Sequence, residues 1–463
     1  MASRLKRRLG LVMGLAICWG LAPNLAQAFS PPAGVLIDSK GVLRTITYPD
    51  QTLELTRQRI SESKAAQNPK VAQKSTLRKV SLNRLEKALE GQLANDRRPT
   101  DEMLHLAGLT RLTHVFVYPD SGDVVIAGPA EGWFKDLSGR SVGVQTGKAI
   151  LQLEDLVTAL RAYPPGAKGT RFIGCSIDAT KEGLARMQQF LGSLPRTADA
   201  SMATDEYAQY IVDGLRTSLG LQKVRIDGVP PESHFAQVLV EADYRMKLIG
   251  IGLEVPPVKI TSYVDRANPA QVASNAMQRW WFVPDYKCVK VSEDKLAMEM
   301  IGQGLQLMNE DEVVLAGGQR KGTGQSQNRA SQAFVQNFTQ KYPELASKVP
   351  VYGQLRNLVD MAIAATFMQE QDYYGKAGWK MTTLADETKF PVQTCTTPVE
   401  VETAVAKKWK GLQLMTPVGG GVSLRPQTAL TSENLLADED GKVEKARQGV
   451  SVTNLAEGQW WWD

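Results

Sequence analysis

The sequence predicts an α+β fold, with layered α/β packing as the alternative. The expected core is a central mixed sheet packed with amphipathic helices, followed by a more antiparallel region and a C-terminal helical segment. Three observations support this fold class. Strand-like runs alternate with helical patterns from residue 112 to 249, strand-like runs succeed one another after Pro256 and Pro257, and residues 330–368 have helical spacing throughout.

Length and composition are those of a globular protein with a sizeable core. The chain has 463 residues, of which 43% are hydrophobic and 22% charged. Length alone suggests two or three domains. This composition excludes collagen-like, disordered and disulfide-scaffold classes.

Residues 1–28 have the pattern of a signal peptide. A basic segment containing Arg4 and Arg8 precedes an apolar run that is too short to span a bilayer, and Ala26-Gln-Ala28 is a small-x-small cleavage site. Lipid attachment at Cys18 is disfavoured because bulky Ile17 precedes it. We therefore expect an exported protein, in the periplasm or at the cell surface.

Removal of this segment changes the charge balance. It carries four basic and no acidic residues, so the remainder has 50 basic against 49 acidic residues, a net charge of +1 rather than +5. No basic run with interleaved aromatic residues follows, so no nucleic-acid partner is expected. No later apolar stretch approaches about 18 residues, so no transmembrane span is expected after the signal is removed.

The first part of the mature chain, residues 29–99, is expected to be a mostly helical lead-in. A small hairpin is predicted over residues 34–47, where apolar runs flank a turn. Ser81 is placed to cap a helix whose leucines recur at helical spacing.

A central α/β domain is expected over residues 100–255. Thr100 begins a helix, 112–118 and 124–128 form a hairpin around a Pro-Asp-Ser-Gly turn, and a helix starts near residue 153. A strand over 171–177 should lead to a helix capped by Asp178. Thr204 and Ser233 are expected to cap two further helices.

The remaining sequence divides into a β-rich region at 256–325, a helical and short-strand region at 326–430, and a polar tail at 431–463 that ends in three tryptophans. In the first region, 260–264, 280–283, 287–291 and 296–300 are expected to be strands. Pro343 and Pro350 should interrupt the helices of the second region.

Four residues are the catalytic candidates. Cys175 and Ser176 lie where a strand is expected to meet a helix N-terminus, a position that favours a thiolate or an oxyanion, and His234 or His114 could act as base. Glu131 could pair with Asp155 or Asp243 for glycoside chemistry. Capping residues and surface carboxylates would show the same patterns.

No cofactor or metal site is predicted. The three histidines share no helical turn, and His-Glu-x-x-His, Cys-x-x-Cys and nucleotide-binding glycine motifs are all missing. Cys175, Cys288 and Cys395 are expected to be buried apolar residues, although one internal disulfide would also fit an exported protein.

Aromatic residues are the better functional signal. Trp280 and Trp281 are adjacent in an expected strand, so they should face opposite sides, one in the core and the other open to a ligand. Trp460, Trp461 and Trp462 follow a polar segment, and they should either pack on their own domain or bind a partner.

Several blocks resemble the planctomycete family called domain of unknown function 1598. They include Ile126-Ala-Gly-Pro-Ala-Glu-Gly-Trp133, Cys175-Ser-Ile-Asp178, Ala242-Asp-Tyr-Arg-Met-Lys247 and Arg279-Trp-Trp-Phe282. The resemblance extends from about residue 34 to 425. It implies a secreted protein and carries over no catalytic residue.

Taken together, these observations predict a secreted cell-envelope protein that acts by binding or as a scaffold. An envelope protein or polysaccharide is the expected partner. The alternative is a hydrolase of envelope or extracellular polymer. These functions differ in a testable way, because an enzyme should bring several polar candidates together in one concave site.

Overall fold

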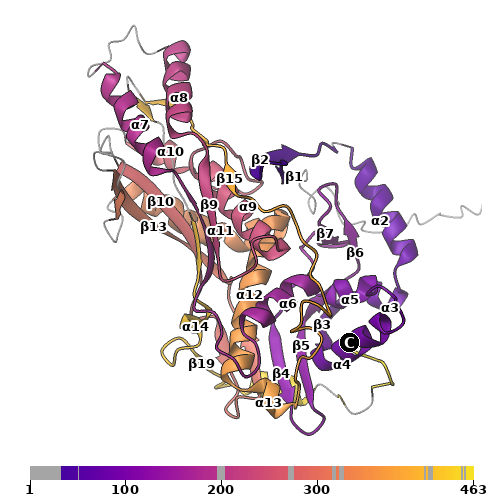
Figure 1. The fold of residues 1–463 in the computed structure, drawn as a ribbon. Helices are drawn as coiled ribbons and strands as arrows, with labels where there is room; N and C mark the ends of the chain where they lie inside the picture. Colours follow the sequence, from indigo (N-terminus) through magenta and orange to yellow (C-terminus); the bar gives the residue numbers. More distant parts are fainter. Residues whose placement is uncertain are drawn as a thin grey trace, which may run out of the picture.

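The computed structural model describes most of the chain. The described residues are 33–50, 52–195, 204–268, 276–314, 320–322, 328–410, 413–415, 421–449, 452 and 455–463. The expected signal peptide lies outside these residues. The fold is α+β, as predicted, with two mixed sheets and helices between and around them (Figure 1).

The larger sheet has nine strands in the described part of the chain, in the order β1-β2-β15-β9-β8-β18-β10-β13-β14. The pairs β2–β15 and β18–β10 are parallel, and all other neighbours are antiparallel. Its strands are Ala33–Ile37 (β1), Val42–Thr47 (β2), Ile173–Asp178 (β8), Gln222–Asp227 (β9), Ala276–Pro284 (β10), Leu305–Val314 (β13), Arg320–Gly322 (β14), Glu400–Val401 (β15) and Gly421–Leu424 (β18).

The smaller sheet has the order β19-β11-β12-β4-β5-β3-β20, and only β19–β11 is parallel. Its strands are Ser75–Ser81 (β3), His114–Tyr118 (β4), Asp123–Ala130 (β5), Val289–Val291 (β11), Ala297–Met300 (β12), Leu436–Ala437 (β19) and Trp461–Trp462 (β20). Two hairpins stand apart, one of Trp133–Lys135 (β6) with Ser141–Gly143 (β7), the other of Lys408–Lys410 (β16) with Gln413–Met415 (β17).

The helices lie between and around the two sheets. They are Glu54–Ala66 (α2), Pro69–Ala72 (α3), Leu82–Leu93 (α4), Asp101–Leu104 (α5), the 3₁₀ turn Leu106–Gly108 (η1), Leu153–Ala162 (α6), Lys181–Ser193 (α7), Asp205–Leu219 (α8), His234–Gly250 (α9), Tyr263–Arg266 (α10), Arg329–Lys348 (α11), Pro350–Glu370 (α12), Tyr373–Lys376 (α13), Pro426–Ala429 (α14) and Lys442–Gln448 (α15). In Figure 1, α7 and α8 project at the end of the molecule farthest from β4 and β5.

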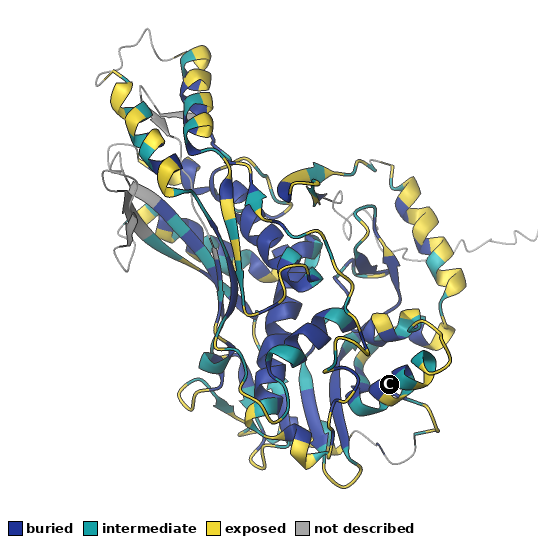
Figure 2. Ribbon diagram, in the orientation of Figure 1, coloured by how far each residue is buried: buried dark blue, intermediate teal, exposed yellow. Residues whose placement is uncertain are grey.

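Helix α12 is the centre of the core. Every residue from Val351 to Met368 is buried, and α12 packs against α6, α9, α11 and α14. Figure 2 shows it as a continuously buried helix, whereas α2, α7 and α8 expose one face each. A helix that is apolar all round needs neighbours on all sides. Even so, no helix among the described residues is long and apolar enough to cross a membrane.

Most of the predicted helix starts are confirmed. The hydroxyls of Ser81, Thr100, Thr204 and Ser233 each accept a backbone N–H at the start of a helix. The prediction for Asp178 was wrong, because Thr180 caps α7 instead. Asp178 ends β8, two residues before that cap.

Two further predictions of secondary structure were wrong because other contacts outweighed the local sequence preference. Pro343 lies inside α11 rather than ending a helix, since Phe338, Tyr342 and Leu345 on both sides of it are packed in the core. Residues 260–264 form no strand. Ser262 instead accepts the backbone N–H of Asp265 and begins the short helix α10.

The predicted segment boundaries do not separate the sheets. The larger sheet takes strands from residues 33 to 424, and the smaller from 75 to 462. One hydrophobic cluster extends from Leu43 to Trp460. The described chain therefore shares one main core across all of these segments.

The tryptophan triplet is docked on its own protein. Trp461 and Trp462 form β20, which pairs with β3, and Trp460 is only 7% exposed. The wholly buried Arg78 guanidinium donates to both Asp463 carboxylate oxygens at 2.8 and 2.9 Å, and lies 4.8 Å from the centre of the Trp461 ring. Four backbone carbonyls also accept hydrogen bonds from its two terminal nitrogens. Of the two alternatives for this segment, the structure therefore favours packing.

We predict that Asp463→Asn lowers the free energy of unfolding by about 2 kcal/mol, because it weakens the charge-assisted hydrogen bonds of a buried guanidinium. Urea denaturation at neutral pH measures the change. Glu457→Gln, at an exposed position in the same segment, is the control and should shift stability by less than about 0.5 kcal/mol. Equal stability of the two variants would contradict the proposed docking role.

Candidate functional site

A polar cavity lies where the β6–β7 hairpin, α5, α6, α9 and α12 meet. Its volume is about 360 Å³, within the usual range of small-molecule sites. The lining residues share a polar character: two cations, three carboxylates, two histidines and four glutamines, namely Lys135, Arg140, Asp101, Glu154, Glu241, His105, His234, Gln152, Gln237, Gln354 and Gln393.

The first histidine of the cavity is positioned by a helix start. Ser233 caps α9, so His234 is its first residue and turns toward α6. There its Nδ1 lies 3.0 Å from both carboxylate oxygens of Asp155. Its Nε2 lies 3.4 Å from the amide nitrogen of Gln354 on α12.

The electrostatics of His234 follow from Asp155. Burial alone would lower the pKa of His234, but the negative charge and hydrogen bonds of Asp155 outweigh burial and raise that pKa above its usual value. Glu154 adds to the same effect. The site therefore favours the imidazolium form more than water does.

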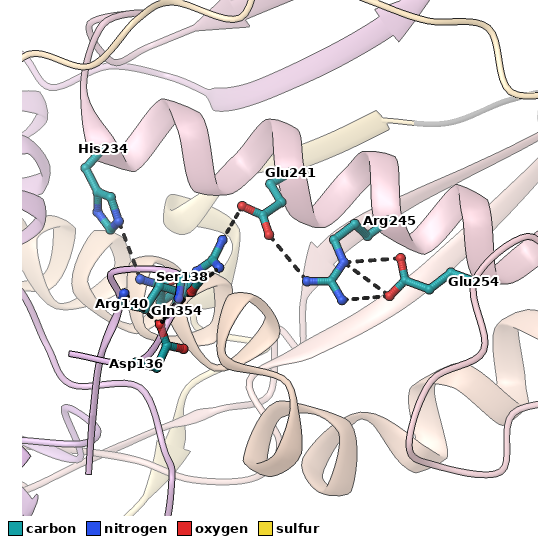
Figure 3. A network of polar contacts seen from close by, with 8 residues as sticks. All are labelled: Asp136, Ser138, Arg140, His234, Glu241, Arg245, Glu254 and Gln354. Atoms are coloured by element: carbon teal, nitrogen blue, oxygen red, sulfur yellow. Dashed lines mark hydrogen bonds and ion pairs between the residues drawn. The ribbon is translucent and has the colours of Figure 1, made fainter. Parts of the chain in front are cut away.

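A chain of ion pairs continues from the cavity wall along α9 (Figure 3). Arg140 donates to Gln354 Oε1 at 3.0 Å, to Ser138 Oγ at 2.9 Å, and to Glu241. One turn further along α9, Arg245 contacts Glu241 at 3.4 Å and Glu254 at 2.7 Å. These fixed pairs hold Arg140 and Gln354 in place at the cavity.

The second histidine, His105, follows α5 and contacts the β6–β7 hairpin. Its Nε2 lies 2.7 Å from the hydroxyl of Ser141, and its Nδ1 lies 3.1 Å from Asp101 Oδ1. The ring of Trp133 packs against its imidazole, with ring centres 4.9 Å apart. All four residues are anchored to regular structure at α5, β6 and β7.

A second hollow of about 530 Å³ adjoins this histidine. It shares Asp101, His105 and Lys135 with the cavity, and is otherwise lined by α2 and β6. The two hollows therefore meet at His105. An elongated ligand could contact both.

The structure does not bring the four predicted catalytic residues together. Only His234 lines the cavity. Cys175 is buried inside the larger sheet, where burial raises the pKa of its thiol well above the usual range and Asp243 raises it further. A protonated thiol that does not line the cavity is a poor candidate nucleophile. Ser176 is the next residue of the same strand and lies outside the cavity.

The carboxylates of the glycoside hypothesis are each held by a different partner. Glu131 is 2% exposed and accepts hydrogen bonds from the backbone N–H of Gln145 and the hydroxyl of Thr146. Asp155 binds His234, and Asp243 pairs with Lys247 at 3.0 Å. Neither Glu131 nor Asp155 nor Asp243 lines the cavity.

The predicted aromatic binding residues have different environments. Trp280 is wholly buried, donates to Ser331 Oγ at 2.9 Å and packs against Phe334, so it is a core residue and not a binding residue. Trp281 is half-buried, beneath the Arg279 guanidinium. Trp460, Trp461 and Trp462 line a third hollow of about 570 Å³ beside α3.

Cysteines and acidic residues form no metal centre in the described part of the chain. No group of three or more histidine, cysteine, aspartate or glutamate side chains there is arranged to hold a metal ion. Cys175, Cys288 and Cys395 are all unpaired, and the first two are buried. Cys395 lines the cavity, where burial raises the pKa of its thiol and the charge of Glu154 adds to the rise.

Sequence reasoning missed His105, Ser141 and Arg140. Asp101 and His105 are four residues apart in the helix predicted to begin at Thr100, and that spacing was a usable signal. Ser141 lies 36 residues beyond His105 in sequence. Nothing local marks that contact.

Comparison with known proteins finds a protein family that matches part of the chain. Residues 175–263 match the family described as "Protein of unknown function (DUF1598)". This segment is shorter than the resemblance expected from the sequence. It contains α7, α8, β9 and α9 together with most of β8, and it ends at the first residue of α10. No curated protein and no solved structure matches the chain.

We predict that Asp155→Asn lowers the pKa of His234, because the carboxylate that favours the imidazolium is lost. A raised folded-state pKa stabilises the protein fully below the unfolded value of about 6.5, and this stabilisation disappears as pH rises through the folded pKa. The stability deficit of Asp155→Asn should therefore be largest near pH 5.5 and smaller near pH 9.

Imidazole titration by nuclear magnetic resonance and urea unfolding at both pH values measure these effects. Asp213→Asn, which changes an exposed carboxylate on α8, is the control and should leave the His234 titration unaltered. A deficit that grows with pH would contradict the assignment.

Proposed function

We propose that this is an exported cell-envelope protein that binds a hydroxyl-rich ligand, such as a segment of envelope polysaccharide, in the cavity between the β6–β7 hairpin and α9. The observation that carries the proposal is the lining of that cavity. Four glutamine amides and several fixed charged groups converge on about 360 Å³ of space.

The chemistry of the lining favours sugars over ions. An amide offers both a donor and an acceptor, which matches a hydroxyl group that is also both. Arg140 is paired with Glu241, and His234 with Asp155. Because these charges are balanced inside the site, a neutral polar ligand suits it better than a phosphate or a nucleotide.

The shape of the site supports a ligand longer than one sugar ring. The second hollow meets the cavity at Asp101, His105 and Lys135, and extends along α2 past Trp133. A pocket with a few fixed polar groups beside an aromatic residue is the usual setting for oriented binding.

A scaffold role through the tryptophan triplet receives less support. Trp460 is buried and β20 is hydrogen-bonded to β3, so the triplet has a structural role of its own. The hollow beside α3 leaves Trp461 and Trp462 half-exposed. An envelope protein as partner therefore remains the second proposal, tied to that hollow.

We predict that wild-type protein binds oligosaccharides derived from envelope polysaccharide, and that the double variant Gln237→Ala/Gln393→Ala binds them at least tenfold more weakly. Two lost hydrogen bonds of about 1 kcal/mol each account for that factor. Isothermal titration calorimetry after a glycan-array screen makes the measurement.

Gln336→Ala serves as the matched control, because Gln336 is an exposed glutamine on α11 outside the cavity. It should bind like wild type. The proposal is abandoned if no saccharide binds the folded protein, or if the double variant binds as tightly as the control.

A further inference from the structure

Asp101, His105 and Ser141 have the geometry of a nucleophile, a base and an orienting carboxylate. The Ser141 hydroxyl lies 2.7 Å from His105 Nε2, and His105 Nδ1 lies 3.1 Å from Asp101 Oδ1. The first distance is that of a hydrogen bond, and the second places the carboxylate in ion-pair contact with the imidazole, as in such triads. The hydroxyl, the imidazole and the carboxylate all belong to residues that line the cavity.

The tautomer of His105 follows from its surroundings. Nδ1 also lies 2.8 Å from the backbone carbonyl oxygen of Asp101. A carbonyl can only accept a hydrogen bond, so Nδ1 carries the proton in the neutral ring. Nε2 is then the unprotonated nitrogen and accepts the hydrogen of the Ser141 hydroxyl. This is the tautomer that a general base needs.

The orienting carboxylate is itself fixed. Asp101 Oδ2 accepts the indole N–H of Trp133 at 3.1 Å, while the Trp133 ring packs on the imidazole. The hydrogen bond from His105 lowers the pKa of Asp101, so this carboxylate is ionised at neutral pH. An ionised Asp101 stabilises the imidazolium that forms when His105 takes a proton.

A cation is available beside the nucleophile. Lys135 pairs directly with Ser141 across the β6–β7 hairpin, and it lines both the cavity and the adjoining hollow. Directly opposite residues of an antiparallel pair have Cβ atoms about 5 Å apart. An ammonium group at this position can stabilise negative charge that develops next to Ser141.

We propose that Ser141 is a catalytic nucleophile, with His105 as its base and Asp101 as the residue that orients it, in the hydrolysis of an ester on the bound ligand. The substrate class, an O-acylated saccharide, rests on the proposed function of the cavity. The nucleophile assignment rests on the triad geometry alone.

The reaction balances with water as the only co-reactant. Ser141 Oγ bonds to the acyl carbon while His105 takes the hydroxyl proton, and the ester C–O bond then breaks as His105 returns that proton to the departing sugar oxygen. Water next attacks the acyl-serine, and His105 moves its proton to Ser141 Oγ as the acid leaves. Ester and water thus become alcohol and carboxylic acid.

The other nucleophilic groups of the molecule fit less well. Cys395 lines the same cavity, but burial and the carboxylates of Glu154 and Asp155 raise the pKa of its thiol. Ser176 lies outside the cavity in β8. His234 is paired with Asp155 and faces Gln354, not a hydroxyl.

The test uses a fluorophosphonate probe and 4-nitrophenyl acetate on the folded chain. We expect one covalent adduct, located on Ser141 by peptide mass spectrometry. Ser141→Ala should lower the labelling and hydrolysis rates at least about 100-fold. Ser176→Ala removes a hydroxyl outside the site and should react at the wild-type rate.

A comparison of kcat with KM separates a positioning role of Asp101 from a structural one. In Asp101→Asn the kcat for 4-nitrophenyl acetate should fall at least about 100-fold while KM stays within about twofold of wild type, because the base is misoriented and the binding surface is kept. Asp101→Glu, which keeps the carboxylate, should recover part of the lost kcat. An unchanged kcat in Asp101→Asn would overturn the role assigned to Asp101.

Either of two results would overturn the assignment of Ser141 as nucleophile. In the first, the wild-type protein binds saccharide by calorimetry but neither reacts with the probe nor cleaves the ester. In the second, Ser141→Ala is labelled as fast as wild type. The first leaves the binding proposal standing. If Ser141 is labelled but the protein binds no saccharide, the assignment of Ser141 as nucleophile stands and the proposal of a saccharide ligand is wrong.

Discussion

The burial of α12 from Val351 to Met368 is the constraint on which the rest of the structure depends. Charged and polar side chains on a helix enclosed in this way are costly unless most of them find partners. Asp360 is 1% exposed and receives the Arg111 guanidinium at 2.8 Å, while Gln354 accepts from Arg140 and faces His234. The polar wall of the cavity is therefore attached to the centre of the core. The position of Gln354 in that wall is thus set by core packing.

The sequence predicted local secondary structure better than it predicted which distant residues lie close together in the fold. The hairpin over 34–47, the hairpin of β4 and β5, and the helix starts at Ser81, Thr100, Thr204 and Ser233 were all available from turn residues and caps. Those signals act over a few residues. Pro343 and residues 260–264 were mispredicted because core contacts in the first case and a hydroxyl cap in the second outweighed the local preference.

The candidate site could be predicted only in part, for the same physical reason. His234 and Asp155 were both considered, yet 79 residues separate them and no spacing rule joins them. Cys175 had the pattern of a strand-end nucleophile, but it is buried in a sheet that β18 completes from far along the chain. A nucleophile depends on exposure and on its neighbours, and both are properties of the tertiary fold.

The position of β18 also has a consequence for how the protein reaches its native state. Residues 421–424 lie between β8 and β10 in the middle of the larger sheet, so β8 and β10 are joined only through a strand that follows them by well over 100 residues. Strands so far apart in sequence give the fold a high contact order. The chain loses conformational entropy when the intervening loop closes, before the new strand contacts can stabilise it. During synthesis the two halves of this sheet would display unpaired inner edges until β18 emerges. The protein should therefore fold slowly and after translation, and it should depend on chaperones that shield those edges.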